Sequence, residues 1–276
     1  MDESLHPRRA DLRTDVTMSL PSPFRIIAHR GASGYAPENT MAAFQAAVAM
    51  GVTEIETDVH FSRDRHLVLL HDHTLERTTN GKGRPGDFDL EELKSLDAGS
   101  WADPLKNADL AWTKNFAGEP LVTLDELFAE FGEGLTYHVE LKDPEYGVAE
   151  AVAESVATAG LARHTFVTGF ERPNDLLRAR SALPGLRTTP LIPTSCDPGE
   201  AIRTCADEGH DGVSIHIDAA TTEWGEMAHN TGLEIRCWGV RTRESMASGA
   251  ACGINGMTIN WPDWLQDWAE TESSRA

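Results

Sequence analysis

Cysteine is scarce in this sequence, and basic residues are outnumbered by acidic ones. Cysteine occupies only 4 of the 276 positions. These cysteines, Cys196, Cys205, Cys237 and Cys252, form neither a CxxC pair nor a histidine-paired zinc spacing, so we expect no disulfide framework and no cysteine zinc site. The 24 lysines and arginines face 44 aspartates and glutamates, which gives a formal net charge of −20. So acidic a protein should repel nucleic acid and anionic membranes, although a local basic cluster or a metal would still admit a small anionic substrate.

A long apolar run is also missing from the start of the chain. Residues 1–23 are charged, contain two prolines and lack the continuous hydrophobic stretch that a signal peptide or a membrane span requires. We therefore expect a cytoplasmic protein without stable membrane insertion. Its flexible N-terminal arm would cover residues 1–23. The whole chain is 40% hydrophobic, which is enough for one domain with a sizeable core over residues 24–276.

Strand and helix patterns alternate along the rest of the chain. Strands are predicted at residues 24–29, 53–59, 135–141, 164–169, 186–192, 211–217, 233–238 and 255–260. Helices are predicted at residues 40–50 with Asn39 as N-cap, and at 124–131, 148–159, 174–183, 199–208, 222–230 and 242–250. Eight such units over about 250 residues indicate an α/β protein with a (β/α)₈ TIM barrel, in which functional residues gather at the C-terminal ends of the strands.

One additional strand interrupts this alternation. Residues 66–71 follow the 53–59 strand too closely for a parallel crossover, which needs about a dozen residues or more, so the two strands should form a hairpin. A turn centred near residues 63–64 would place His71 roughly opposite Glu56. The next stretch, residues 74–119, fits no barrel element and predicts a small capping insertion after the second strand.

Alternation within two strands directs acidic side chains into the barrel. In the 53–59 strand, Glu54, Glu56 and Asp58 share one face, and the opposite face is apolar. The same alternation turns His138, Glu140 and Lys142 inward. Glu56, Asp58 and Glu140 should therefore meet near the mouth of the barrel.

Three buried carboxylates need positive charge beside them. Each pair would repel by roughly 4 kcal/mol at about 4 Å with an effective dielectric near 20. Ligation by oxygen alone favours one divalent Mg²⁺ or Ca²⁺ over zinc. With such an ion, Arg30 and Lys142 would make the pocket attractive to a phosphate. His29 and His71 would supply the acid and the base that cleavage of a phosphodiester needs.

Short motifs extend over most of the predicted barrel in a fixed order. They are His29-Arg30-Gly31, Pro37-Glu38-Asn39-Thr40, Ile55-Glu56-Thr57-Asp58-Val59, His71-Asp72, Arg77-Thr78-Thr79, Leu96-Asp97-Ala98-Gly99, Phe116-Ala117-Gly118-Glu119, Thr123-Leu124-Asp125-Glu126 and Glu140-Leu141-Lys142, followed by Trp238. In this order and spacing, the sequence resembles the bacterial, cytoplasmic type of glycerophosphodiester phosphodiesterase.

The resemblance implies a metal-dependent hydrolase that converts glycerophosphodiesters to sn-glycerol 3-phosphate and an alcohol such as choline or ethanolamine. It implies that the glycerol hydroxyl attacks first and that water then opens a cyclic phosphate, with either histidine as the first base. By matching position, the implied metal ligands are Glu56, Asp58 and Glu140, the acid–base pair is His29 and His71, and the phosphate-binding residues are Arg30 and Lys142. Trp238 is expected to form a wall of the substrate pocket.

The sequence departs from the family pattern at three places. Asn260 stands where the family usually has aspartate, His138 where asparagine is common, and Gly239 where threonine is usual. These positions should border the substrate pocket and could alter the preferred head group.

Three other functions remain open at this stage. An amidohydrolase would use His71 and His73 as an HxH metal motif, but that leaves Glu56, Asp58 and Glu140 unexplained. A sphingomyelinase-D-like lipase shares the barrel and the paired histidines, but the acidic composition and the absence of an export signal count against it. A barrel that binds phosphodiesters without turnover is the third, and Asn260 is the feature that points to it.

Overall fold

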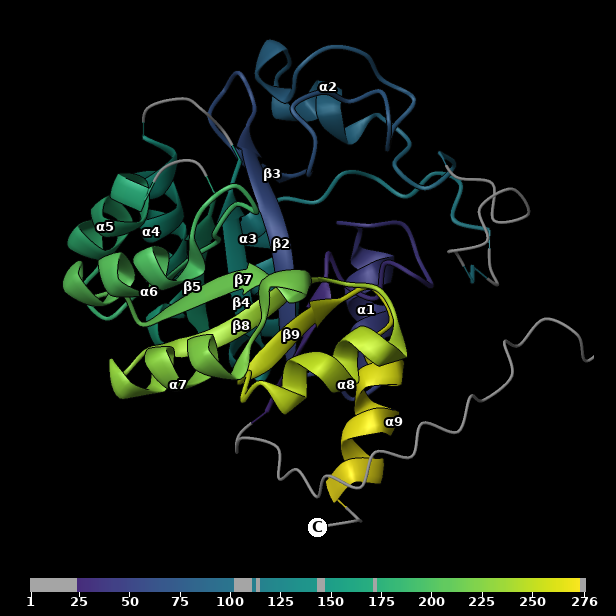
Figure 1. The fold of residues 1–276 in the computed structure, drawn as a ribbon. Coiled ribbons are helices and arrows are strands. Elements are labelled where there is room, and N and C mark those ends of the chain that lie inside the picture. The colour runs from purple at the N-terminus through teal and green to yellow at the C-terminus, as the bar shows by residue number, and fades with distance from the viewer. Residues whose placement is uncertain (1–23, 102–110, 113–114, 143–146, 171–172, 274–276) are drawn as a thin grey trace, which may run out of the picture.

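The computed structural model of the chain describes residues 24–101, 111–112, 115–142, 147–170 and 173–273. Eight parallel strands in these residues form a nearly closed barrel (Figure 1). They are β1 (Arg25–His29), β2 (Glu54–Phe61), β4 (Thr136–Leu141), β5 (Thr165–Gly169), β6 (Arg187–Pro190), β7 (Gly212–His216), β8 (Glu234–Val240) and β9 (Gly256–Ile259). Their order around the barrel is β6-β5-β4-β2-β1-β9-β8-β7, and a bridge between Leu191 and Ser214 joins its two ends. The predicted TIM barrel is confirmed.

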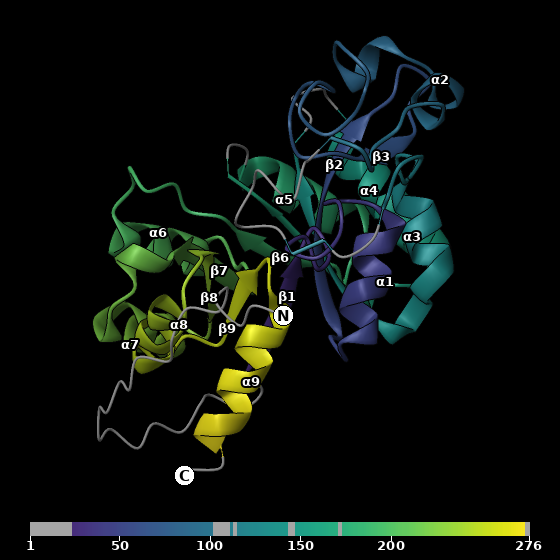
Figure 2. The same cartoon turned by 90° about the vertical axis from the view of Figure 1, so that its right-hand side faces the viewer.

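Helices surround the strands on the outside of the barrel. They are α1 (Met41–Ala49), α3 (Leu124–Phe131), α4 (Val148–Ala159), α5 (Pro173–Ala182), α6 (Pro198–Asp207), α7 (Thr222–Asn230), α8 (Arg243–Ala251) and α9 (Pro262–Ser273). Figure 2 shows α1 and α3 on one flank, with α6, α7 and α8 on the opposite flank. The apolar faces of β2 and β4 pack against these helices, as Ile55 and Tyr137 do, and their opposite faces direct polar side chains such as Glu54 and His138 into the barrel.

The first helix begins one residue later than the sequence suggested. Thr40 is its N-cap, and the Thr40 hydroxyl accepts a hydrogen bond from the backbone N–H of Ala43. The prediction of Asn39 as N-cap was therefore wrong. The Asn39 side chain turns toward the barrel mouth instead.

The predicted hairpin is present, with its register moved by one residue. β3 (Leu67–Leu69) runs antiparallel to β2 and pairs Val59 with Leu69, a register that, when continued, sets His71 opposite Thr57 and not opposite Glu56. The shift arises because the loop has three residues and closes between Ser62 and His66, with Arg65 in the left-handed region at φ 68°.

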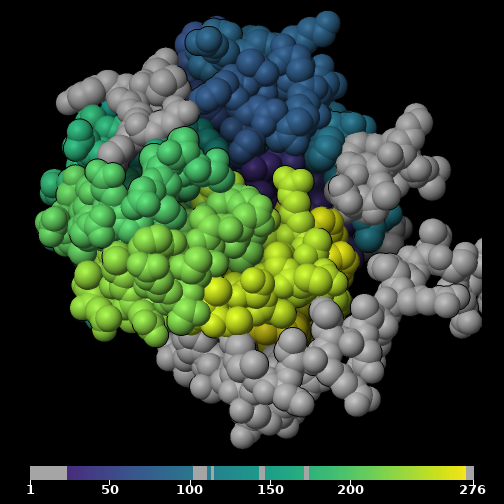
Figure 3. Space-filling model, in the orientation of Figure 1, coloured from purple at the N-terminus to yellow at the C-terminus, as the bar shows by residue number. Residues whose placement is uncertain are grey.

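The insertion after β3 has a small hydrophobic centre of its own. It contains α2 (Leu90–Lys94) and buries Val68, Leu70, Leu75, Leu93, Ala98 and Leu121. In Figure 3 it lies in blue above the green and yellow C-terminal half, and purple residues from the start of the barrel are visible between the two. The predicted arm at residues 1–23 and part of the predicted insertion lie outside the described residues.

None of the helices in the described residues combines the length and the apolar character needed to cross a membrane.

A layer of buried charge lies beneath the mouth of the barrel. Glu54 accepts hydrogen bonds from Arg25 Nη1 at 2.7 Å and pairs with His138 Nε2 at 2.8 Å. His138 Nδ1 in turn contacts Arg236. Burial opposes ionisation of Glu54, but His138 and Arg25 prevail and lower its pKa to about 2. His138 is therefore part of this layer and only 2% exposed, whereas the sequence analysis had placed it beside the substrate.

Glu54→Gln should reduce the free energy of unfolding by roughly 3 kcal/mol at neutral pH, because the pKa of Glu54 lies below its unfolded value. A depressed carboxyl pKa contributes stability above the unfolded value of 4.5 and loses it as pH falls toward about 2. Urea unfolding of the wild type and of Glu54→Gln at a series of pH values measures this. The difference between their free energies of unfolding should be constant near neutral pH and should become smaller in acid. Equal stability at pH 7 would contradict the prediction.

Candidate active site

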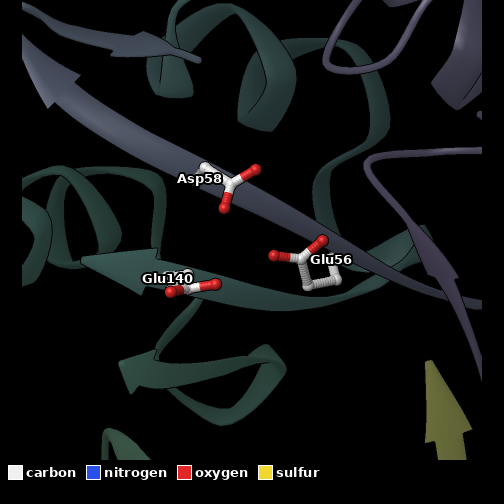
Figure 4. Close-up of side chains that lie close together, drawn as sticks. All are labelled: Glu56, Asp58 and Glu140. Carbon is white, nitrogen blue, oxygen red and sulfur yellow. The ribbon is translucent and has the colours of Figure 1, made fainter. Parts of the chain in front are cut away.

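Three carboxylates from two neighbouring strands meet at the mouth of the barrel. β2 supplies Glu56 and Asp58, and β4 supplies Glu140, which is in register with Asp58. One oxygen of each lies within 4.8 Å of the others. Figure 4 shows the three groups pointing toward one another. Glu56 and Glu140 are each 6% exposed and Asp58 is 0% exposed, so the cluster is buried as the alternation predicted.

Two cations from adjoining segments contact this cluster. Arg30 Nε lies 3.2 Å from Asp58 Oδ2. Lys142 Nζ lies 2.6 Å from Glu140 Oε1 and 3.6 Å from Asp58 Oδ1. Two positive charges therefore face three acidic groups, which leaves the cluster short of positive charge.

This imbalance appears in the pKa values of the three acids. Burial and the charge of Asp58 raise the pKa of Glu56 well above its usual value and that of Glu140 to about 7. Although burial opposes it, Arg30 and Lys142 hold the pKa of Asp58 far below its usual value. Asp58 Oδ1 is buried and accepts no hydrogen bond from the described residues. An unsatisfied carboxylate oxygen between two acids is what a hard divalent cation would ligate, so these residues fit a metal.

The end of β1 is shaped to bring its backbone close to the cluster. Arg30 and Gly31 both have positive φ, 56° and 79°. The Arg30 N–H donates to Glu56 Oε2 at 3.1 Å. A Cβ on residue 31 would lie 2.6 Å from the Ala43 carbonyl carbon, so both the space and the conformation require glycine. The sequence His-Arg-Gly thus ends the strand in a turn that points an amide at the acidic cluster.

His29 lies at the edge of the cluster with a neutral partner. Its Nδ1 is 2.6 Å from Asn260 Oδ1, and its Nε2 is 3.9 Å from Glu56 Oε2. Because an amide oxygen only accepts, Nδ1 carries the hydrogen and Nε2 keeps its lone pair. Burial and Arg30 lower the pKa of His29 to about 3. Asn260 therefore keeps the orienting contact that an aspartate would make, but without its charge.

His71 follows β3 and has a charged partner. Its Nδ1 lies 2.7 Å from Asp72 Oδ1. Burial lowers the pKa of His71, although Asp58 and Asp72 favour the protonated ring. The two histidines thus differ in the charge of the group behind each ring.

His73 does not belong to this centre. Its ring packs edge-on against His60, with the ring centroids 5.4 Å apart. Among the described residues, the group that could hold a metal is Glu56, Asp58 and Glu140. This arrangement removes the structural basis for the HxH amidohydrolase reading.

Asn39 was missed as a residue of the site. Its Nδ2 donates to Asp58 Oδ2 at 2.9 Å, and its Oδ1 accepts from the Thr57 hydroxyl at 2.8 Å. Asn39 has a φ of 57° and is 3% exposed. It fixes the orientation of the Asp58 carboxylate. Its position inside the Pro37 to Thr40 motif is the sequence feature that could have identified Asn39 as a residue of the site.

Trp238 lies across the mouth from the cluster. Its ring makes edge contacts with Phe170 at 5.0 Å and with His216 at 4.5 Å. The Phe170 ring centroid is in turn 5.7 Å from Lys142 Nζ. The adjacent Gly239 has φ 77°, and a Cβ there would lie 2.4 Å from His216 Nε2. The structure therefore connects Trp238 to the cluster through Phe170 and not by direct contact.

Comparison with known proteins gives consistent matches over most of the chain. The model of the "Glycerophosphoryl diester phosphodiesterase family" matches residues 29–264. A glycerophosphodiester phosphodiesterase of Bacillus subtilis (strain 168) is 31% identical over 266 residues, which cover 89% of this chain and 87% of the relative.

Two solved structures show the same fold. A glycerophosphodiester phosphodiesterase from Agrobacterium tumefaciens str. C58 has a TM-score of 0.74 at 28% identity, over 88% of this chain and 99% of its own. A phosphodiesterase from Oleispira antarctica, solved in complex with the product sn-glycerol-3-phosphate, has a TM-score of 0.75 at 24% identity, over 91% of this chain and 97% of its own.

Proposed function

This chain belongs to the glycerophosphoryl diester phosphodiesterase family, and we propose from that premise that it hydrolyses glycerophosphodiesters to sn-glycerol 3-phosphate and an alcohol. The observation that carries the proposal is the buried cluster of Glu56, Asp58 and Glu140 with Arg30 and Lys142 beside it. A phosphate and a divalent cation together would satisfy the charges of this group. The product bound in the Oleispira antarctica structure agrees with this reaction.

Glu56, Asp58 and Glu140 would hold one Mg²⁺ or Ca²⁺, since all their ligand atoms are carboxylate oxygens. When bound, the ion would supply positive charge that stabilises the negative charge developing at the phosphate. Asn39 would keep the Asp58 carboxylate turned toward the ion by its 2.9 Å hydrogen bond.

Arg30 and Lys142 would bind the non-bridging oxygens of the phosphate. Both side chains are largely buried, 14% and 15% exposed, at the edge of the carboxylate cluster. A cation held in a partly desolvated pocket stabilises the additional negative charge of the phosphoryl transition state more strongly than an exposed one does. Trp238 and Phe170 would wall the side of the pocket opposite the cluster.

His29 and His71 would exchange protons with the reacting oxygens. His29 Nε2, with its lone pair, takes the proton of the glycerol hydroxyl as that oxygen attacks phosphorus. His71, whose Nδ1 is held by Asp72, gives its proton to the departing alcohol oxygen as the phosphorus–oxygen bond breaks. In the second step, His71 accepts a proton from water and His29 returns its proton to the glycerol oxygen, which opens the cyclic phosphate.

Release of sn-glycerol 3-phosphate tests this function most directly. The purified protein, stripped with EDTA, should be inactive on glycerophosphocholine and glycerophosphoethanolamine, because the carboxylates would then lack the positive charge that the phosphate requires. Adding Mg²⁺ or Ca²⁺ should restore product, measured with glycerol 3-phosphate dehydrogenase. Folded protein that releases no product with Mg²⁺, Ca²⁺ or Zn²⁺ would refute the proposal.

A further inference from the structure

We propose that Arg77, in the insertion, is a positioning residue that holds both His71 and Arg30 in place through two carboxylates. The proposal rests on the function proposed above, because His71 and Arg30 have their roles in that reaction. The Arg77 guanidinium donates hydrogen bonds to Asp72 and Glu38. Asp72 in turn contacts His71, and Glu38 contacts Arg30.

 

One side of the Arg77 guanidinium binds the carboxylate behind His71. Arg77 Nε donates to Asp72 Oδ2 at 2.6 Å, and Nη2 donates to Asp72 Oδ1 at 2.9 Å. Asp72 Oδ1 is also the atom that lies 2.7 Å from His71 Nδ1. A bidentate pair fixes the plane of the carboxylate as well as its position, so Arg77 sets the direction in which Asp72 meets the imidazole.

The other side of the same guanidinium binds the carboxylate behind Arg30. Arg77 Nη1 donates to Glu38 Oε2, and Nη2 donates to Glu38 Oε1, both at 2.8 Å. Glu38 Oε1 accepts a further bond from Arg30 Nη1 at 2.8 Å. Arg30 then reaches Asp58 through its Nε. One side chain thus connects the loop after β1 with the segment after β3.

The backbone around Arg77 is held firmly enough for this role. Leu75 is fully buried, and Thr78 and Thr79 are 4% and 7% exposed. The Thr79 N–H donates to the Leu75 carbonyl oxygen at 3.0 Å, and the Thr79 hydroxyl donates to the same oxygen at 2.7 Å. Arg77 therefore projects from a turn that is anchored on both sides, although its own side chain is 40% exposed.

A guanidinium is the group that this arrangement requires. Four N–H···O contacts in a planar fork join two carboxylates. A lysine ammonium has the same charge but no fork, so it cannot orient both carboxylates at once. Arg77→Lys should therefore lose nearly as much kcat as Arg77→Ala. Such a result would show that Arg77 acts by orienting the two carboxylates and not by its charge alone.

The test compares kcat and KM of the metal-loaded wild type, Arg77→Ala and Arg77→Lys on glycerophosphocholine. We expect kcat to fall about 10-fold or more in both variants, because misplaced acid–base groups act mainly on the chemical step, and KM to change less. Added methylguanidinium should restore part of the lost kcat in Arg77→Ala and none in Arg77→Lys, where the side chain still fills the site. Arg77→Ser, which also leaves the space of the guanidinium open, repeats the rescue if Arg77→Ala does not fold.

Arg63 offers a matched control in the same region. Its guanidinium also pairs with two carboxylates, since Nη2 lies 2.7 Å from Asp89 and 2.9 Å from Glu92. The Arg63 side chain is 51% exposed, and these two carboxylates contact neither His71 nor Arg30. Arg63→Ala should keep wild-type kcat. If wild type turns over and Arg77→Ala equals it, or if methylguanidinium restores nothing, the role of Arg77 is overturned while the proposed function stands. Wild-type protein without turnover would refute the proposed function itself.

Discussion

His71→Ala should lower turnover of glycerophosphocholine about 100-fold or more while the barrel remains folded, because a positioned acid–base group commonly contributes that much. His71 Nδ1 is bound to Asp72, which leaves the other ring nitrogen for the reacting oxygen. The side chain is 32% exposed and lies outside the hydrophobic core, so its removal leaves no large internal cavity. Initial rates at saturating substrate and metal, with a thermal unfolding curve for each protein, measure the effect.

His66 provides the matched control for this substitution. It belongs to the loop of the same hairpin, and its 49% exposed side chain pairs with Asp64 at 3.3 Å and with none of the three carboxylates. His66→Ala should keep wild-type turnover. Wild-type turnover in His71→Ala would instead remove the two-histidine mechanism.

Glu56→Gln should weaken metal binding and turnover together, each by about 10-fold or more, because the change removes one ligand charge from a site of three carboxylates. Glutamine has nearly the same shape and can still accept the bond from the Arg30 N–H. The loss should therefore come from charge and not from a collapsed turn. Titration calorimetry with Mg²⁺ and Ca²⁺, together with activity as a function of metal concentration, measures both quantities.

Glu54→Gln is the control on the same strand and the same face. Its carboxylate is paired with Arg25 and His138 one step below the cluster. We expect this variant to lose stability but to keep the metal dependence of the wild type. If Glu56→Gln retained wild-type metal affinity, the ligand assignment would have to move to other residues.

The sequence predicted the barrel well because its signals are local and repeated. Each of the eight parallel strands overlaps its predicted range, and strand alternation correctly turned Glu56, Asp58 and Glu140 inward. A period of two along a strand decides which face a residue occupies, and neighbouring parallel strands then bring such faces together.

The errors occurred where one residue or one long-range contact decides the geometry. A three-residue loop with Arg65 in the left-handed region moved the hairpin register by one position. Asn39 resembled an N-cap, but Thr40 caps the helix while Asn39 binds Asp58. The contacts of Arg77 with Glu38 span 39 positions of the chain, which no local pattern encodes.

The close approach of Gly239 and His216 limits which side chains position 239 can accept. The imidazole fills the space that any side chain at position 239 would need, and it is held by the Trp238 ring and by the Asp218 N–H. A threonine at 239 would require the His216 ring to move, and it would also strain a backbone with φ 77°. The glycine that departs from the family pattern thus leaves room for the His216 ring to lie against Trp238.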